Sequence, residues 1–310
     1  MRIALVLGSG GARGYAHVPV IQEIERRGHE IVAVAGTSMG ALVGGVYAAG
    51  ALEPFTEYVM SMNSADLRRM ADLTLRSPGL IRLHKAMDKL SEFTGDVRIE
   101  NLRIPYTAVA TDIDHTREVW FRSGKLIAAI RASISLPAVF TPVQASGRIL
   151  VDGGLLNPLP IGPTRDVDAD LCVAVSLFGR SSGLYSRAPR DTSADDAADT
   201  DHDEPDEAGS DGLADSWLGR RLAQLLSRPA EQHLFDDVSS GTDVALIDMA
   251  IRALDMMQGQ IEIARTAMSA PEVLISVPLD TCSALEFDRA QEVMDLGHRL
   301  AVEAFDRAGL

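Results

Sequence analysis

The segment AVAGTSMGALVGG, residues 33–45, places a serine between two glycines directly after an apolar run. The run itself, IVAVAG at residues 31–36, predicts a strand, and the small apolar residues after Ser38 predict a helix. A GxSxG pentapeptide between a strand and a helix is typical of a nucleophile elbow, a turn so sharp that only residues such as Gly36 and Gly40 fit beside the exposed hydroxyl. The same pattern also fits an ordinary glycine-rich turn with Ser38 as the helix cap.

The segments around this turn alternate between strand and helix. Residues 3–8 predict a first strand and residues 15–28 a helix that ends at Gly28. This βαβα order implies a right-handed crossover and a parallel sheet, whose carboxyl-end loops carry ligands and chemistry. The remaining predicted elements are a helical segment at 51–95, strands at 106–113, 118–124, 170–179 and 272–279, and helices at 125–136, at about 216–227 and 243–268 and from about Ala284. Residues 148–156 predict a strand that enters a glycine turn.

Composition restricts the class of protein. With 310 residues, 46% of them hydrophobic, the chain can bury a large core. Two cysteines, Cys172 and Cys282, form neither a disulfide framework nor a CxxC metal pair, so we expect a reducing compartment and no zinc. The first apolar run breaks at Gly8, too early for a signal peptide, and no later window is long enough to span a bilayer. We therefore expect a cytoplasmic protein whose membrane contact, if any, is peripheral.

The negative charge is concentrated in one segment. The net charge is -15, but residues 191–215 contain eleven Asp and Glu and no Lys or Arg. The rest of the chain contains 33 acidic and 29 basic residues, so its net charge is -4. No basic stripe with interleaved aromatic residues is present, so we expect no nucleic-acid partner. The acidic segment is too polar to offset its ordering entropy and is predicted to be disordered.

The first predicted strand ends in a second glycine-rich turn, GSGGARG, residues 8–14. Successive glycines let several backbone N–H groups converge on one point, which can bind an anion or a developing oxyanion. A dinucleotide-binding loop is the alternative, but Arg13 stands where GxGxxG has its third glycine, and the next strand lacks the acidic residue that binds a ribose. A Walker A loop is excluded because no Gly-Lys-Ser/Thr triplet follows.

A serine hydroxyl needs a positioned base before it can act as a nucleophile. Asp152, in the segment ILVDGG, ends a predicted strand and precedes Gly153 and Gly154, which allow close backbone approach. A partly buried carboxylate beside a serine can serve directly as the general base, although an ordinary Asp-Gly turn is the alternative interpretation. A histidine base of the α/β-hydrolase type is a third hypothesis. Its candidates, none at the end of a predicted strand, are His84, His115, His202, His233 and His298.

In this order, the GSGGARG turn ahead of AHV, the GTSMG elbow and the DGG turn at Asp152 resemble the motifs of bacterial patatin-like phospholipases. RASISLPAVFTPV at 131–143 and NPLP at 157–160 are also similar, so the resemblance covers nearly the whole chain outside the acidic segment. It implies an α/β fold, namely a three-layer α/β/α architecture with a mostly parallel central sheet. It further implies a single catalytic domain over residues 1–310, interrupted by a disordered acidic insert at about 186–215.

The resemblance also implies roles for individual residues. Ser38 is expected to attack a lipid or simpler ester carbonyl and form an acyl-enzyme, with Asp152 as the general base. The amides of Gly10 and Gly11, with Ala12, are expected to form the oxyanion hole. Neither a metal nor a cofactor is implied. The supporting positions are Arg13, Gly14, Gly36, Gly40, Gly153 and Gly154.

Some positions leave alternatives open. Arg13 either faces an anionic headgroup or braces its own loop, and His17 is expected to pack structurally in the first helix. Ser9 stands where many members of the family have a glycine. Pro19 also replaces a usual glycine and is tolerable only in the first turn of a helix.

The alternative function is a non-catalytic regulatory or interaction protein whose acidic segment recruits a basic partner. In the segment 51–95, methionines at positions 60, 62, 70 and 87 fit either core packing or the wall of an acyl-chain cleft.

Overall fold

The computed structural model describes residues 1–63, 66, 72–73, 81–180 and 243–310. The chain divides into one compact unit formed by Met1–Ser186 with Leu246–Leu310, and a second formed by Arg187–Ala245. The predicted acidic insert at about 186–215 and the predicted helix at 216–227 lie outside the described residues. The single catalytic domain therefore stays a prediction, and the first unit is the one whose structure follows.

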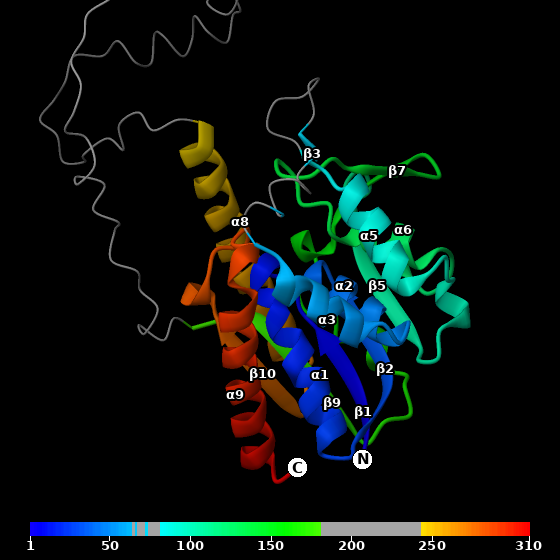
Figure 1. The fold of residues 1–310 in the computed structure, drawn as a ribbon, viewed down its shortest axis with the longest axis vertical. Coiled ribbons are helices and arrows are strands. Elements are labelled where there is room, and N and C mark those ends of the chain that lie inside the picture. The colour runs from blue at the N-terminus through cyan, green and yellow to red at the C-terminus, as the bar shows by residue number, and fades with distance from the viewer. Residues whose placement is uncertain (64–65, 67–71, 74–80, 181–242) are drawn as a thin grey trace, which may run out of the picture. The chain divides into compact units, whose positions relative to one another are not determined.

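An eight-stranded sheet lies at the centre of the first unit (Figure 1). Its strands follow the order β10, β9, β1, β2, β5, β8, β7, and β6 also pairs with β5. The strands from β10 to β5 run parallel, whereas β6, β7 and β8 are antiparallel to their neighbours, which confirms a mostly parallel sheet. The bounds are β1 Arg2–Leu7, β2 Glu30–Thr37, β5 Tyr106–Asp112, β6 Arg117–Phe121, β7 Val143–Ala145, β8 Arg148–Asp152, β9 Leu171–Gly179 and β10 Val273–Pro278.

Both faces of this sheet are covered, which confirms the predicted three layers. Leu5 and Leu7 of β1 belong to the main hydrophobic core with residues of α1, α2 and α9. Val6, which points to the opposite face, packs with Leu159 and Ala174 instead. Helix α8 also covers this second face, because its Glu262 hydrogen-bonds Ser176 of β9. The helices are α1 His17–Arg26, α2 Met39–Ala48, α3 Leu52–Ser61, α5 His84–Thr94, α6 Leu126–Ser133, α8 Asp243–Met268 and α9 Ala290–Ala308.

The first helix begins two residues later than predicted. Residues Gly11–Ala16 form a 3-10 helix, η1, and α1 starts at His17. Pro19 is therefore the third residue of α1, within the first turn, where a backbone N–H has no partner inside the helix. Pro19 thus lies in the first turn of a helix, as the sequence required.

Three other predicted boundaries are wrong. The segment 51–95 is not helical throughout, because a two-stranded sheet of β3, Asp72–Leu73, and β4, Ile81–Arg82, separates α3 from α5. The sequence between these strands includes a Pro-Gly pair, which disfavours helix. The last helix begins at Ala290 and not near Ala284, since a 3-10 turn at Phe287–Arg289 precedes it. Helix α6 ends at Ser133, three residues before the predicted end at 136.

None of the helices in the described ranges is both long enough and apolar enough to cross a bilayer. This agrees with the hydropathy of the sequence.

Helix α9 approaches η1 at a glycine, and this contact is testable. A Cβ added to Gly297 would lie 2.8 Å from Ala16 Cα, which is closer than real Cβ contacts. Gly297→Ala should therefore lower the free energy of unfolding by about 1–3 kcal/mol, although an alanine inside a helix ordinarily adds about 1 kcal/mol. Urea denaturation of both proteins measures the difference.

Gly259→Ala is the matched control for this prediction. The added Cβ would lie 3.5 Å from Phe178 Cβ, an ordinary van der Waals contact, and Gly259 lies within α8. We expect this variant to be as stable as the wild type or more stable by up to about 1 kcal/mol. Equal gains in both variants would contradict the close packing of α9 on η1.

Candidate active site

The site forms where two strands meet end to end on one edge of β5. Strand β6 pairs with Ala108–Asp112 of β5 and occupies one edge, so β2 and β8 share the other. Thr37 at the end of β2 pairs with Val109, and Asp152 at the end of β8 pairs with the next residue, Ala110. Because β2 runs parallel to β5 and β8 antiparallel to it, their carboxyl ends point toward each other. Residues far apart in the sequence are thereby brought side by side.

Ser38 follows β2 in a strained turn. Its φ is 54° and its ψ is -120°, a region that residues with a side chain rarely adopt. The flanking glycines allow the sharp turn, because a Cβ on Gly36 would lie 2.3 Å from Gly40 O and one on Gly40 would lie 2.1 Å from Leu7 O. The local geometry is that of a nucleophile elbow, with the serine at the first position before α2.

The hydroxyl of Ser38 contacts the carboxylate predicted from the sequence. Ser38 Oγ donates to Asp152 Oδ2 at 2.5 Å, and Gly154 N donates to Asp152 Oδ1 at 2.7 Å. Ser133, which the sequence analysis did not identify, accepts a hydrogen bond from Ser38 N at 2.8 Å and donates to Val109 O at 2.6 Å. Ser133 thus ties the elbow to β5 from the end of α6.

Burial changes the acidity of Asp152. Its side chain is 2% exposed, and this desolvation raises its pKa from 3.8 to about 6, against the opposing effect of hydrogen bonds from Ser38 and Gly154. No cationic side chain forms an ion pair with Asp152 among the residues that the structure describes. The carboxylate is therefore ionised at neutral pH, yet it is more basic than an ordinary aspartate.

The turn after β1 presents backbone amides to the same place. Gly10 and Gly11 have φ values of +152° and +59°, and within the described ranges neither N–H donates to a protein acceptor. Both residues line the cavity that also contains Ser38 and Asp152. Ala12 differs, because its N–H donates to Ala284 O at 2.9 Å. In this conformation the free donors are thus those of Gly10 and Gly11, two of the three residues expected from the sequence.

The remaining glycines of the motifs allow close approach between loops. A Cβ on Gly153 would lie 2.2 Å from Val109 O, and one on Gly14 would lie 2.2 Å from Met39 Cγ. At Gly154 an added Cβ would lie 2.4 Å from Gln258 Oε1, the end of a side chain of α8. Side chains at these positions would force the loops apart.

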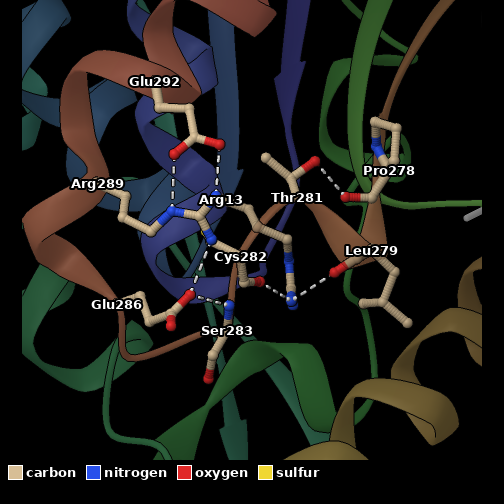
Figure 2. A network of polar contacts seen from close by, with 9 residues as sticks. All are labelled: Arg13, Pro278, Leu279, Thr281, Cys282, Ser283, Glu286, Arg289 and Glu292. Atoms are coloured by element: carbon tan, nitrogen blue, oxygen red, sulfur yellow. Dashed lines mark hydrogen bonds and ion pairs between the residues drawn. The ribbon is translucent and has the colours of Figure 1, made fainter. Parts of the chain in front are cut away.

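Arg13 is buried and reaches toward the connection between β10 and α9 (Figure 2). It is 1% exposed, and its Nη1 donates to Cys282 O at 3.1 Å and more distantly to Leu279 O at 3.5 Å. Its Nη2 lies 2.9 Å from Asp255 Oδ2, an ion-pair distance without the angles of a hydrogen bond. Of the two alternatives for Arg13, these contacts are those of a residue that braces its loop.

The histidines lie elsewhere. His17 Nε2 donates to Gly8 O at 2.9 Å, and complete burial lowers the pKa of His17 to about 4, so the ring is neutral. His115 contacts Asp112 at the far end of β5. None of the histidines in the described part of the chain hydrogen-bonds Ser38, and His202 and His233 lie outside it. The contacts thus offer Ser38 a carboxylate partner and no imidazole.

An apolar cavity of about 410 Å³ leads to the Ser38 hydroxyl. This volume falls within the roughly 300–1,000 Å³ of small-molecule sites. Helices α3 and α5, both from the segment 51–95, line one wall, and two of the four methionines singled out there, Met62 and Met87, belong to it. Met60 is instead exposed, and Met70 lies outside the described residues. The other apolar residues of this wall include Phe55, Val59, Leu90 and Phe93.

Comparison with known proteins shows the family of this chain. The family model described as patatin-like phospholipase matches residues 5–165, a range that includes Ser38 and Asp152. The uncharacterized NTE family protein Mb1092c of Mycobacterium bovis is 39% identical over 98% of this chain and 91% of its own length. The chain therefore belongs to the patatin-like phospholipase family.

More distant relatives are larger proteins. A patatin-like phospholipase domain-containing protein of Caenorhabditis elegans, ZK370.4, is 28% identical over 99% of this chain but only 21% of its own length. Lysophospholipase NTE1 of Yarrowia lipolytica is 35% identical over 56% of this chain and 12% of its own length. This chain thus matches one part of each of these larger proteins.

The buried carboxylate predicts a pH-dependent effect on stability. Because the folded-state pKa of about 6 lies above the ordinary value of 3.8, the wild type loses stability as the pH rises through this interval. Asp152→Asn removes the charge and should raise the free energy of unfolding at pH 8 by on the order of 2–3 kcal/mol. Urea denaturation between pH 4 and pH 8 should show that this gain shrinks toward zero near pH 4.

Asp114→Asn is the control, since Asp114 is exposed on the turn after β5. We expect it to be as stable as the wild type at pH 8, because the side chain is exposed. A stability difference between Asp152→Asn and wild type that stays constant across the pH range would contradict the raised pKa.

Proposed function

We propose that this protein is a serine lipid acyl hydrolase that works through a Ser38/Asp152 dyad. The single observation that carries the proposal is the hydrogen bond from Ser38 Oγ to the buried carboxylate of Asp152, where both residues line an apolar cavity. Membership of the patatin-like phospholipase family supports a lipid hydrolase. The relative named as a lysophospholipase supports a lysophospholipid or related lipid ester as the substrate.

In the proposed first step, Ser38 Oγ attacks the ester carbonyl while Asp152 takes its proton. A carboxylate with a pKa near 6 is a better proton acceptor than an ordinary aspartate and is still ionised at neutral pH. The amide N–H groups of Gly10 and Gly11 would donate to the oxyanion of the tetrahedral intermediate. When this intermediate collapses, the proton on Asp152 passes to the leaving alcohol, and the acyl group remains on Ser38.

In the second step, Asp152 takes a proton from water, which attacks the acyl-enzyme and releases the fatty acid. The proton then returns to Ser38 Oγ, so the same carboxylate serves both half-reactions. The apolar cavity would hold the acyl chain and exclude other water from the carbonyl. The strained turn would present the hydroxyl of Ser38 to the cavity that Gly10 and Gly11 also line.

The direct test is a comparison of wild type and Ser38→Ala. We expect the wild type to react covalently with a fluorophosphonate probe and to hydrolyse p-nitrophenyl esters, with faster turnover of longer acyl chains because the cavity is apolar. Ser38→Ala should lose both properties, since it lacks the nucleophile. Lysophospholipid and diacyl phospholipid, assayed beside the ester series, would then separate a lysophospholipase from a phospholipase or a simple esterase.

Ser61→Ala is a control, because this serine ends α3 and its hydroxyl donates to Tyr58 O. It should be labelled and active like the wild type. A folded wild type that neither reacts with the probe nor hydrolyses any of these esters would favour the non-catalytic alternative.

The proposed base makes the rate pH-dependent. We expect kcat/KM to rise with pH through about 6 and to level off above it, because only ionised Asp152 can accept the proton. Asp152→Asn should lower kcat by about 10²- to 10⁴-fold at pH 7.5. Stopped-flow or steady-state assays with one p-nitrophenyl ester measure both effects, and near-normal turnover in Asp152→Asn would refute the dyad.

A further inference from the structure

Beyond Ile251, which packs with Val139 and Ala284, the inner side of α8 is polar, which is unusual for a helix packed on a sheet. Asp255, Gln258 and Glu262 follow one another at intervals of three and four residues and therefore share one face. All three side chains are largely buried. Large apolar side chains of the same helix, such as Met256 and Ile263, are exposed instead. Apolar burial therefore does not explain why the face with Asp255, Gln258 and Glu262 packs against the protein, and polar contacts of these side chains must contribute.

Gln258 contacts the residue that precedes the oxyanion glycines. Ser9 Oγ donates to Gln258 Oε1 at 2.6 Å, and both side chains are buried, with 1% of Ser9 and 5% of Gln258 exposed. A buried hydrogen bond of this kind is costly to break, because the remaining partner would stay desolvated and unpaired. Ser9 N also donates to Pro158 O at 2.8 Å, so both the side chain and the backbone of Ser9 are held.

The same pair lies against the turn that carries the proposed base. A Cβ on Gly154 would lie 2.4 Å from Gln258 Oε1 and 2.8 Å from Ser9 Oγ. The N–H of Gly154 in turn donates to Asp152 Oδ1. The Ser9–Gln258 pair is therefore in contact with both the oxyanion turn and the Asp152 turn.

Asp255 holds the other end of the oxyanion turn. Its Oδ2 lies 2.9 Å from Nη2 of Arg13, whose guanidinium is buried. Arg13 also binds the carbonyls of Leu279 and Cys282 in the connection between β10 and α9 (Figure 2). That connection supplies Ala284 O, the acceptor of Ala12 N–H. The free amides of Gly10 and Gly11 thus lie between two residues, Ser9 and Arg13, that α8 holds.

We propose that α8 is a positioning element of the active site and that Gln258, acting through Ser9, is a positioning residue for the oxyanion amides of Gly10 and Gly11. This inference rests on the proposed function, because it concerns the donors of that reaction. The polar inner face of α8 serves to orient the turn.

The test compares Ser9→Ala, Gln258→Leu and the double variant in the full-length protein. Each change removes one partner of the hydrogen bond with little change in volume. We expect kcat to fall by about 10- to 100-fold in each, since small displacements of donors from the oxyanion cost this much. KM should change by less than about twofold, because the amides act on the transition state and not on ground-state binding.

The double variant and a second readout separate positioning from a general loss of structure. If the pair acts as one unit, the double variant should be no slower than the slower single variant. Hydrogen–deuterium exchange should show faster uptake in residues 8–14 for all three, with unchanged uptake in α1. Gln260→Leu is the control, because Gln260 lies on the exposed side of α8, and it should match the wild type in rate and uptake.

Two outcomes would overturn the inference. In the first, Gln258→Leu has the same kcat and the same deuterium uptake in residues 8–14 as Gln260→Leu. In the second, the losses in kcat of the two single variants multiply in the double variant. These outcomes are distinct from failure of the proposed function. An inactive, unlabelled wild type would refute the hydrolase, while the exchange data would still decide whether α8 orders the turn. An active wild type with unaffected variants would refute only the role of Gln258.

Discussion

The site depends on the way in which β2 and β8 share one edge of β5. Val109 and Ala110 are consecutive residues of β5. Val109 pairs with Thr37 and Ala110 pairs with Asp152, so the ends of β2 and β8 lie next to each other along this edge. Hydrogen bonds of a sheet are directional, so this register determines the distance between the strand ends before any side chain is considered. The contact between Ser38 and Asp152 follows from it. A site built on paired strands is held more precisely than one built on free loops.

Close approach of the turns is the second requirement, and it explains the glycines. Gly36, Gly40, Gly153 and Gly154 each lie where a Cβ would meet another chain atom at less than 3 Å. At Gly36 the contacted atom belongs to the same turn, whereas Gly40, Gly153 and Gly154 contact separate segments of the chain. The glycines therefore let the turns at Ser38, Asp152 and Gly10–Gly11 line one cavity, and we infer that contacts from α8 hold that arrangement.

The burial of Asp152 links stability to chemistry. A carboxylate removed from water without a cationic partner destabilises the folded state, yet the same desolvation raises its proton affinity. The hydrogen bonds from Ser38 and Gly154 offset part of this cost and keep the group ionised near neutral pH. Activity and stability thus place opposite demands on this residue, as is common at catalytic sites.

Much of this fold and site could be predicted from the sequence. Apolar runs gave the parallel strands β1, β2, β5, β9 and β10, the boundaries of α8 were predicted to the residue, and the motifs identified Ser38 and Asp152 as a candidate pair. Short-range signals suffice for these features, because hydrophobic periodicity and glycine placement are local properties of the chain. The hairpin of β3 and β4, the late start of α9 and the partner of Ala12 could not be predicted in the same way.

Only the tertiary structure decided which residues support the site. Asp255, Gln258 and Ala284 belong to none of the motifs and lie 242 to 272 residues from the residues that they contact. Ser133 lies in the segment 131–143, but its contact with Ser38, 95 residues away, could not be read from that segment. Their roles arise from pairing across the sheet and from the packing of α8, so no local pattern indicates them. The sequence by itself determined the chemical groups and the turns that expose them. Long-range packing decided their spacing, because distances between remote segments depend on the whole sheet and not on any single stretch of chain.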